Sequence, residues 1–173
     1  MVKNAPNTDV ATHEILGLAF VNTGSSSEYG DKKEAMREID LLEPDSFYAI
    51  SKSSQSLIGQ YLANKKNLPI VNIRLFSVYG PYEAPSRLIP NLMNAAINNT
   101  PIAMVSPKIS RDFIYIDDLI NVYLQIGKLI ELKGEIFNLG TGIQTTLERL
   151  VNETSKIISK PIKANWNEMD PRS

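Results

Sequence analysis

The chain has 173 residues, of which 43% are hydrophobic and 21% charged, and its formal net charge is −1. These values are ordinary for a soluble globular protein of one unit, and the scattered Lys and Arg residues form no basic patch for nucleic acid or an anionic membrane. Cysteine is absent, which excludes disulfides and thiolate metal sites, and His13 is the single histidine. No apolar run approaches the ~20 residues of a membrane span. We therefore expect a cytoplasmic protein without a metal site.

Strand-like and helix-like segments alternate along the chain, separated by turn residues. In chain order, the expected elements are a strand at 18–23, a loop at 30–44, a helix at 46–67, a strand at 69–76, a helix at 87–98, a strand at 102–105, a helix at 116–129, a strand at 135–139 and a helix at 145–158. Asp45 or Ser46 is expected to cap the first helix, and Asp117 or Asp118 the third. Alternation of this kind predicts an α/β fold with parallel strands.

A tyrosine and a lysine four residues apart, Tyr48 and Lys52, lie on the first expected helix. This spacing places both side chains on one helix face, and three serines at 25–27 end the preceding strand. An ammonium near a phenol favours the phenolate, so such a group can move a proton on and off an alcohol or sugar oxygen. On this pair alone, a half-buried aromatic residue beside a solvated lysine stays an alternative interpretation.

The same spacing occurs twice more, at Tyr29/Lys33 and at Tyr61/Lys65. Tyr29 lies in a loop after the first strand, where a spacing of four residues brings no side chains together. Tyr61 lies about 220° round the helix from Tyr48, at about 100° per residue, and therefore faces away. Neither of these two pairs combines a helical face with an upstream hydroxyl cluster.

Six short motifs follow one another along the chain. They are GSSSEYG at 24–30, PDSFYAISK at 44–52, RLFSVYGP at 74–81, RLIPNLM at 87–93, RDFIYIDDL at 111–119 and FNLGTG at 137–142. In this order the chain resembles the extended short-chain dehydrogenase/reductase family, in its branch of NAD-dependent nucleotide-sugar epimerases and dehydratases, over nearly all of 18–158. The resemblance implies the C-terminal part of a Rossmann-type parallel sheet (about 16–81 and 110–142) and a small α/β substrate-binding lobe (about 82–109 and 143–173).

The resemblance also implies roles for individual residues. Tyr48 corresponds to the catalytic acid/base, and Ser25 to the hydroxyl that hydrogen-bonds the sugar oxygen. Lys52 corresponds to the lysine that favours the phenolate and binds the nicotinamide ribose, so the implied cofactor is NAD or NADP. Phe76 falls where the family backbone approaches the nicotinamide.

The implied substrate is a nucleotide-diphosphate sugar. Arg87 and Arg111 are similar to the family's diphosphate ligands, a task suited to the guanidinium fork. Ser26 and Ser77 are the other expected substrate contacts, although the family usually has Asn where this chain has Ser77. For Arg87 and Arg111, the alternative interpretation is that they are exposed, solvated arginines.

The sequence also favours some reactions of this branch over others. The 4,6-dehydratases have Thr-Asp-Glu where this chain has Ser25-Ser26-Ser27, so the acid and base for water elimination are missing. We therefore expect a 4-epimerase or a 4-ketoreductase, and keep a dehydratase relative as an alternative. Gly140-Thr141-Gly142 lacks a third glycine and is expected to be a structural turn.

A dinucleotide site of this fold needs a strand, a glycine-rich turn and a helix N-terminus for the pyrophosphate. None of the nine glycines forms that fingerprint, so we expect a truncated chain that binds the cofactor weakly by itself. The expected partners are a completing N-terminal half or further copies in a homo-oligomer. A non-catalytic fragment that binds a nucleotide sugar or a partner chain is the alternative from another functional class.

Overall fold

The computed structural model describes residues 19–128 and 130–169, so His13 and the first residue of the expected strand at 18–23 lie outside the described residues. The described chain forms two compact units. The first unit extends to Leu75 and resumes at Asp118–Leu139, whereas the second comprises Phe76–Asp117 and the residues from Gly140 onward.

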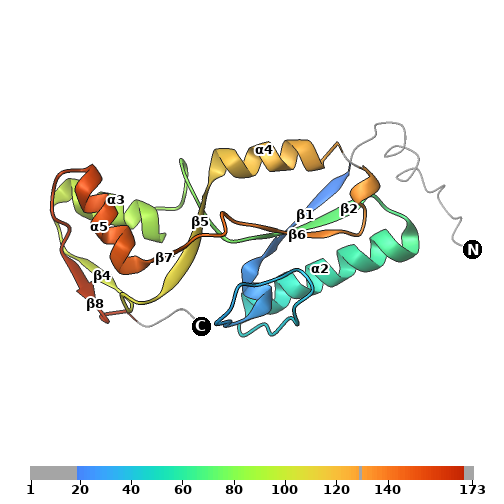
Figure 1. Ribbon diagram of the computed structural model, residues 1–173, viewed down its shortest axis with the longest axis horizontal. Helices are drawn as coiled ribbons and strands as arrows, with labels where there is room; N and C mark the ends of the chain where they lie inside the picture. The colour runs from blue at the N-terminus through green and yellow to red at the C-terminus, as the bar shows by residue number, and fades with distance from the viewer. Residues whose placement is uncertain (1–18, 129, 170–173) are drawn as a thin grey trace, which may run out of the picture. The chain divides into compact units, whose positions relative to one another are not determined.

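The first unit is built on a parallel three-stranded sheet (Figure 1). Its strands lie in the order β1 (Phe20–Ser25), β2 (Ile70–Leu75) and β6 (Ile136–Leu139). The helices α2 (Phe47–Lys66) and α4 (Ile116–Ile126) cover opposite faces of this sheet, and the short 3₁₀ helices are η1 (Ser26–Tyr29) and η2 (Ile130–Leu132). The predicted α/β fold with parallel strands is therefore confirmed.

The two faces of this sheet differ in chemistry because side chains alternate along β2. Val71 and Ile73 point into an apolar cluster with Ile126 of α4. Asn72 and Arg74 are also buried, but they belong to the polar face that α2 covers. On that side α2 buries only small residues, namely Ala49, Ser53, Ser56, Gly59 and Ala63. These small side chains leave room for polar groups between the helix and the sheet.

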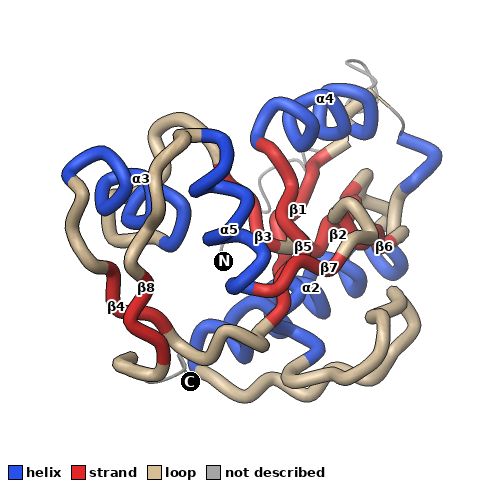
Figure 2. Tube along the Cα trace, turned by 60° about the vertical axis from the view of Figure 1, so that its left-hand side comes forward, coloured by secondary structure: helices blue, strands red, loops and turns tan. Residues whose placement is uncertain are grey.

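The start of α2 was predicted correctly. The Ser46 hydroxyl caps the helix by accepting a hydrogen bond from the Ala49 amide at 3.2 Å. The helix ends at Asn67, which adopts the left-handed conformation (φ 58°) that favours Asn or Gly at a C-cap. The segment before the helix, residues 30–46, contains neither helix nor strand, as predicted for 30–44 (Figure 2).

The second unit combines two small sheets with two helices. Its elements are β3 (Ser77–Tyr79), α3 (Leu88–Asn98), β4 (Ile102–Met104), β5 (Ser110–Tyr115), β7 (Gln144–Thr146), α5 (Leu147–Ile157) and β8 (Ala164–Trp166). β5 pairs in parallel with β3 and antiparallel with β7, while β4 pairs in parallel with β8. The core of this unit consists of Leu92, Ala95, Ile102, Met104, Leu147 and Val151.

One predicted helix cap was wrong. The helix expected at 116–129 begins at Ile116, directly after the last residue of β5, so Asp117 and Asp118 lie within its first turn and do not cap it. The strands β3, β5, β7 and β8 were not predicted either. Three of them have only three residues, and strands this short form through their partners more than through their own periodicity. Among the described residues, no helix is long and apolar enough to cross a membrane.

Candidate active site

Ser25 is the last residue of β1 and caps the short helix η1. Its hydroxyl accepts a hydrogen bond from the Ser27 amide at 3.2 Å and donates one to the Ser27 hydroxyl at 3.1 Å. The residue is only 8% exposed. The hydroxyl is therefore held in one direction at the carboxyl end of a parallel strand, where α/β sheets commonly bind their ligands.

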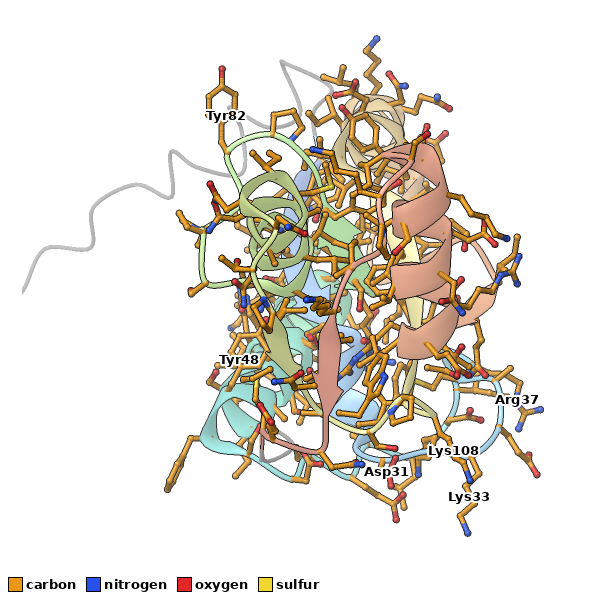
Figure 3. All side chains as sticks on the ribbon, turned by 90° about the vertical axis from the view of Figure 1, so that its left-hand side faces the viewer. Asp31, Lys33, Arg37, Tyr48, Tyr82 and Lys108 are labelled. Carbon is orange, nitrogen blue, oxygen red and sulfur yellow. The ribbon has the colours of Figure 1, made fainter. Side chains whose placement is uncertain are left out.

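Lys52 reaches the same end of β1 from helix α2. Its ammonium donates to the Thr23 carbonyl oxygen at 2.9 Å and to the Gln55 side-chain oxygen at 3.2 Å. Because Thr23 precedes Ser25 by two residues, the fold brings the ammonium and the strand-end serine to one end of the strand. Tyr48 lies one turn earlier on α2 and is 56% exposed (Figure 3).

The two other tyrosine–lysine pairs have different surroundings. Tyr29 is fully buried, and its hydroxyl accepts from the Arg74 guanidinium at 2.7 Å and donates to the Asn138 side chain at 2.8 Å. Burial raises the pKa of Tyr29 above its usual value, although the adjacent guanidinium of Arg74 opposes that shift. Tyr61 is 56% exposed and lies outside the buried stripe of α2. Tyr29 is therefore a core residue, at the end of η1 rather than in a loop.

Glu28 is a buried charge that the sequence analysis missed. One carboxylate oxygen accepts hydrogen bonds from the Ser25 amide at 2.9 Å and from the Ser56 hydroxyl at 3.0 Å. The other oxygen accepts from the Arg74 guanidinium at 2.9 Å, and both side chains of this ion pair are at most 3% exposed. The pattern Ser-x-x-Glu at 25–28 is the signature of a capping box and could have indicated this contact.

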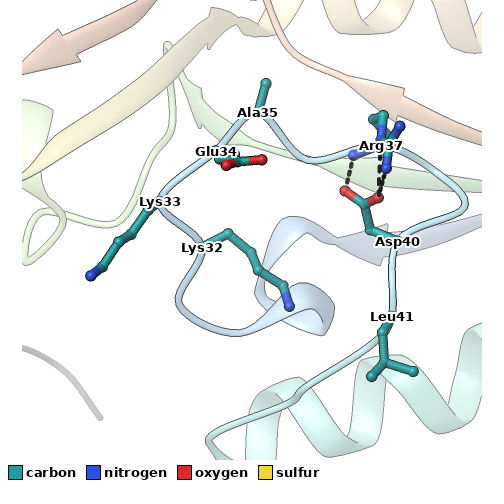
Figure 4. A pocket seen from close by; sticks show the side chains of 7 residues that line it. All are labelled: Lys32, Lys33, Glu34, Ala35, Arg37, Asp40 and Leu41. Atoms are coloured by element: carbon teal, nitrogen blue, oxygen red, sulfur yellow. Dashed lines mark hydrogen bonds and ion pairs between the residues drawn. The ribbon is translucent and has the colours of Figure 1, made fainter.

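The loop between η1 and α2 folds around a hollow of about 390 Å³ (Figure 4). Residues of the loop itself line it, and Arg37 pairs there with Asp40 at 3.0 Å. The Arg37 amide and guanidinium hold the pKa of the Asp40 carboxyl below its usual value. None of the predicted site residues lines this hollow. The loop is anchored to β6, because the Glu38 carboxylate accepts from the Asn138 amide at 2.8 Å.

The predicted substrate ligands Ser77, Arg87 and Arg111 lie in the second unit. Ser77 opens β3, and the exposed Arg111 lies on β5 opposite Thr145. Arg87 is the N-cap residue of α3, and its guanidinium pairs with the Glu83 carboxylate at 3.3 Å while remaining half exposed. A diphosphate bound to Arg87 would therefore compete with this carboxylate.

The turn at Gly140–Gly142 closes around a carboxylate. Asp112 accepts from the Thr141 amide at 2.8 Å, from the Thr141 hydroxyl at 2.7 Å and from the Gly142 amide at 2.8 Å. A side chain at Gly140 would lie 2.6 Å from this carboxylate and 3.2 Å from the Phe76 ring. The turn amides are thus engaged by Asp112, and the prediction of a structural role is confirmed.

A small apolar hollow of about 240 Å³ follows β3 in the second unit. It is lined by Val78, Tyr79, Gly80, Pro81, Tyr82, Glu83 and Ile116. The Tyr82 ring points away from its loop and is fully exposed (Figure 3). This surface was not predicted from the sequence, and its one carboxylate, Glu83, pairs with Arg87.

Residues 9–140 match the model of the NAD dependent epimerase/dehydratase family. The chain belongs to this family. A dTDP-D-glucose 4,6-dehydratase from Homo sapiens is 26% identical over 162 residues, which cover 90% of this chain and 46% of that protein. A dTDP-4-dehydro-6-deoxyglucose reductase from Escherichia coli is 29% identical over 164 residues, covering 87% of this chain and 51% of that protein.

Solved structures of the NAD dependent epimerase/dehydratase family share the fold. UDP-glucuronic acid 4-epimerase from Bacillus cereus, in complex with UDP-glucuronic acid and NAD, superposes with a TM-score of 0.79 at 29% identity. The aligned part covers 88% of this chain and 49% of that protein. The chain therefore spans about half the length of the relatives that it matches.

The donors of the first unit fit one end of a nicotinamide cofactor. Within the described part of the chain no carboxylate pairs with Lys52, so its ammonium can exchange the Gln55 contact for a ribose hydroxyl. The half-exposed Tyr48 hydroxyl on the same helix is a second donor of suitable chemistry. The printed sequence contains no glycine-rich turn for the pyrophosphate, so the fit concerns the ribose end only.

Proposed function

We propose that the chain supplies the catalytic and substrate-binding residues of a nucleotide-diphosphate-sugar 4-epimerase or 4-ketoreductase that uses NAD or NADP. The observation that carries this proposal is the hydrogen bond from the Lys52 ammonium to the Thr23 carbonyl oxygen. Thr23 lies two residues before Ser25, whose hydroxyl caps η1. Tyr48 lies one helical turn from Lys52, which supports an acid/base set at the carboxyl end of β1.

In this proposal Tyr48 is the group that carries the proton. Its phenolate accepts the proton of the sugar 4-hydroxyl as C4 is oxidised, and its phenol returns that proton when C4 is reduced. The bound nicotinamide supplies the hydride acceptor and donor. Lys52 is the proposed ligand of the nicotinamide ribose, and Ser25 orients the sugar oxygen with its hydroxyl.

Ser26 and Ser77 are proposed sugar contacts, and Arg87 and Arg111 are proposed ligands of the diphosphate. Guanidinium groups bind such oxygens through two parallel hydrogen bonds. Arg111 is exposed, and no ion pair occupies it among the described residues. Arg87 must leave Glu83, so we assign the larger share of diphosphate affinity to Arg111.

The surroundings of Ser25 support an epimerase or a reductase over a 4,6-dehydratase. Water elimination needs a separate acid and base, and this chain has Ser26 and Ser27 where the dehydratases have Asp and Glu. The carboxylate nearest in sequence, Glu28, is fully buried and paired with Arg74, so it cannot exchange protons with a sugar.

A homo-oligomer is the proposed assembly. Besides Tyr48, helix α2 exposes five large apolar side chains in described positions, which are Phe47, Ile50, Leu57, Ile58 and Tyr61. At about 100° per residue all five fall within about 100° of the helix circumference, on the side away from the sheet. A contiguous apolar stripe of this kind marks a contact surface for another protein chain.

The reaction can be tested with the natural protein, supplied with NAD and a panel of nucleotide-diphosphate sugars. Proton NMR of the sugar ring distinguishes inversion at C4, reduction of a 4-keto group and loss of water. We expect inversion or reduction at C4. A 4-keto-6-deoxy product would overturn the choice against a dehydratase, and sugar binding without any turnover would favour the non-catalytic alternative.

A further inference from the structure

The buried carboxylate of Glu28 is connected to the proposed reaction through Ser25. Its first oxygen binds the backbone amide of Ser25 at 2.9 Å, and its second binds Arg74 at 2.9 Å. We propose that Glu28, held by Arg74, is the positioning residue that fixes the Ser25 hydroxyl for the sugar oxygen. This inference rests on the proposed role of Ser25, and it adds a residue outside the Ser-Tyr-Lys set.

Three elements hold the carboxylate of Glu28 in place. Besides the Ser25 amide of β1, it contacts the Ser56 hydroxyl of α2 at 3.0 Å and the Arg74 guanidinium of β2. There is no spare room beside it, because a Cβ atom at Gly24 would lie 2.5 Å from its first oxygen. A displacement of this carboxylate would therefore move the end of β1.

Arg74 is itself fixed by further contacts. Its guanidinium donates to the Tyr29 hydroxyl at 2.7 Å and to the Glu38 carbonyl oxygen at 3.1 Å, and it lies 4.7 Å from the centre of the Tyr29 ring. The ion pair thus ties the strand end to η1 and to the loop that follows. A reacting oxygen tolerates little displacement, so loosening this support should slow the reaction.

The chemistry of the site requires two acceptor oxygens that face different donors. A glutamine at position 28 has one acceptor oxygen, and its amide group would face either the Ser25 amide or the Arg74 guanidinium as a second donor. A glutamine at position 74 removes that conflict. Its terminal oxygen, at the same distance along the side chain as the arginine Nε, can accept from the amide of the first glutamine.

Two double variants that replace the ion pair with neutral side chains therefore distinguish a role in positioning Ser25 from a role in the stability of the fold. The double variant Glu28→Gln/Arg74→Gln keeps an acceptor for the Ser25 amide, whereas Glu28→Leu/Arg74→Met fills the space without one. Glu153→Gln is the matched control, because it alters an exposed ion pair with Lys156 on α5. Neither double variant leaves a buried charge without its partner.

The first measurement is hydrogen exchange of the Ser25 amide by NMR in the full chain, which requires no turnover. We expect protection close to wild type in the Gln/Gln variant and the control, and exchange faster by tenfold or more in the Leu/Met variant. Equal protection in both double variants would overturn the inference. Should the Leu/Met variant not fold, loss of protection in the Gln/Gln variant would overturn it as well.

The second measurement is kcat in the full natural protein, with and without Ser25→Ala. We expect the Leu/Met pair to lower kcat on the order of 10- to 100-fold when Ser25 is present, and less than about twofold in the Ser25→Ala background. The Gln/Gln pair should stay within about threefold of wild type, by the same argument. Equal losses in both backgrounds would make Glu28 a purely structural residue.

The outcomes also separate this inference from the proposed function. A normal kcat for Ser25→Ala, together with a large loss for Tyr48→Phe, would overturn the role of Glu28 and leave the tyrosine mechanism standing. A normal kcat for Tyr48→Phe would instead overturn the proposed function itself.

Discussion

The hydroxyl of Tyr123 shows how single residues fix the end of β1. It lies 2.9 Å from the Thr23 hydroxyl, on the face of the sheet opposite to Lys52. Burial raises the pKa of Tyr123 above its usual value, and the bond to Thr23 only partly opposes that shift. Thr23 is therefore held by two helices, through its side chain by α4 and through its carbonyl oxygen by α2.

The raised pKa of Tyr123 gives a prediction for alkaline pH. Below about pH 10 the phenol is neutral in both states, so its contribution to stability is fully present. As the pH rises towards the folded pKa, the unfolded chain releases the proton first and that contribution is lost. We expect Tyr123→Phe to lower the free energy of unfolding by about 1 kcal/mol at pH 7, and the difference from wild type to shrink above pH 10.

Urea unfolding between pH 7 and pH 11 measures this difference. Tyr61→Phe is the control. Because the Tyr61 ring is exposed, removing its hydroxyl should change the free energy of unfolding little at any of these pH values. A difference between wild type and Tyr123→Phe that stays constant over the whole range would contradict the assignment.

At the residue scale the sequence indicated Ser25, Tyr48 and Lys52 through their spacing and their resemblance to a family. Their catalytic roles stay predictions. The same reasoning missed Glu28 and Arg74, because a buried ion pair joins residues 46 positions apart and depends on the register of two strands. The capping-box pattern showed where the Glu28 side chain could turn back, but nothing in it indicated the arginine partner.

At the element scale, α2 carries both the proposed catalytic pair and the exposed apolar stripe. The stripe gives a prediction for assembly: Ile58→Lys places a charge in its middle and should shift the chain towards monomers, because a buried, unpaired charge disfavours the contact. Sedimentation equilibrium measures the change. Asn152→Lys is the control, at an exposed position of α5 outside the stripe. Unchanged oligomers in Ile58→Lys would remove the stripe as the contact surface.

The elements that were predicted well carry their own local signals. The start of α2 has a serine cap. In β2, four of the six residues are Ile, Val or Leu, and the other two are the buried Asn72 and Arg74. By contrast, β5 begins with Ser110, Arg111 and Asp112 and owes its extended form to β3 and β7. Because β5 continues directly into α4 at Ile116, Asp117 lies inside the helix and does not cap it.

At the scale of the whole molecule, the proposed diphosphate ligands lie in the second unit. Arg111 belongs to the second unit, and a nucleoside diphosphate should raise the melting temperature by binding the folded chain. We expect Arg111→Ala to remove most of this rise. Arg149→Ala, which changes an exposed arginine of α5 in the same unit, should keep it. Differential scanning fluorimetry measures both, and an unchanged rise in Arg111→Ala would place the diphosphate elsewhere.

The most direct test of the central claim compares two tyrosines on one helix in the full natural protein. Tyr48→Phe removes the proposed proton carrier and keeps the ring, so the rate of hydride exchange at the sugar should fall by ~10²–10⁴. Tyr61→Phe changes the tyrosine of the Tyr61/Lys65 pair, which has the same spacing but lies on the far side of α2, and should leave that rate within a few-fold of wild type. A near-normal rate in Tyr48→Phe would contradict the proposed mechanism.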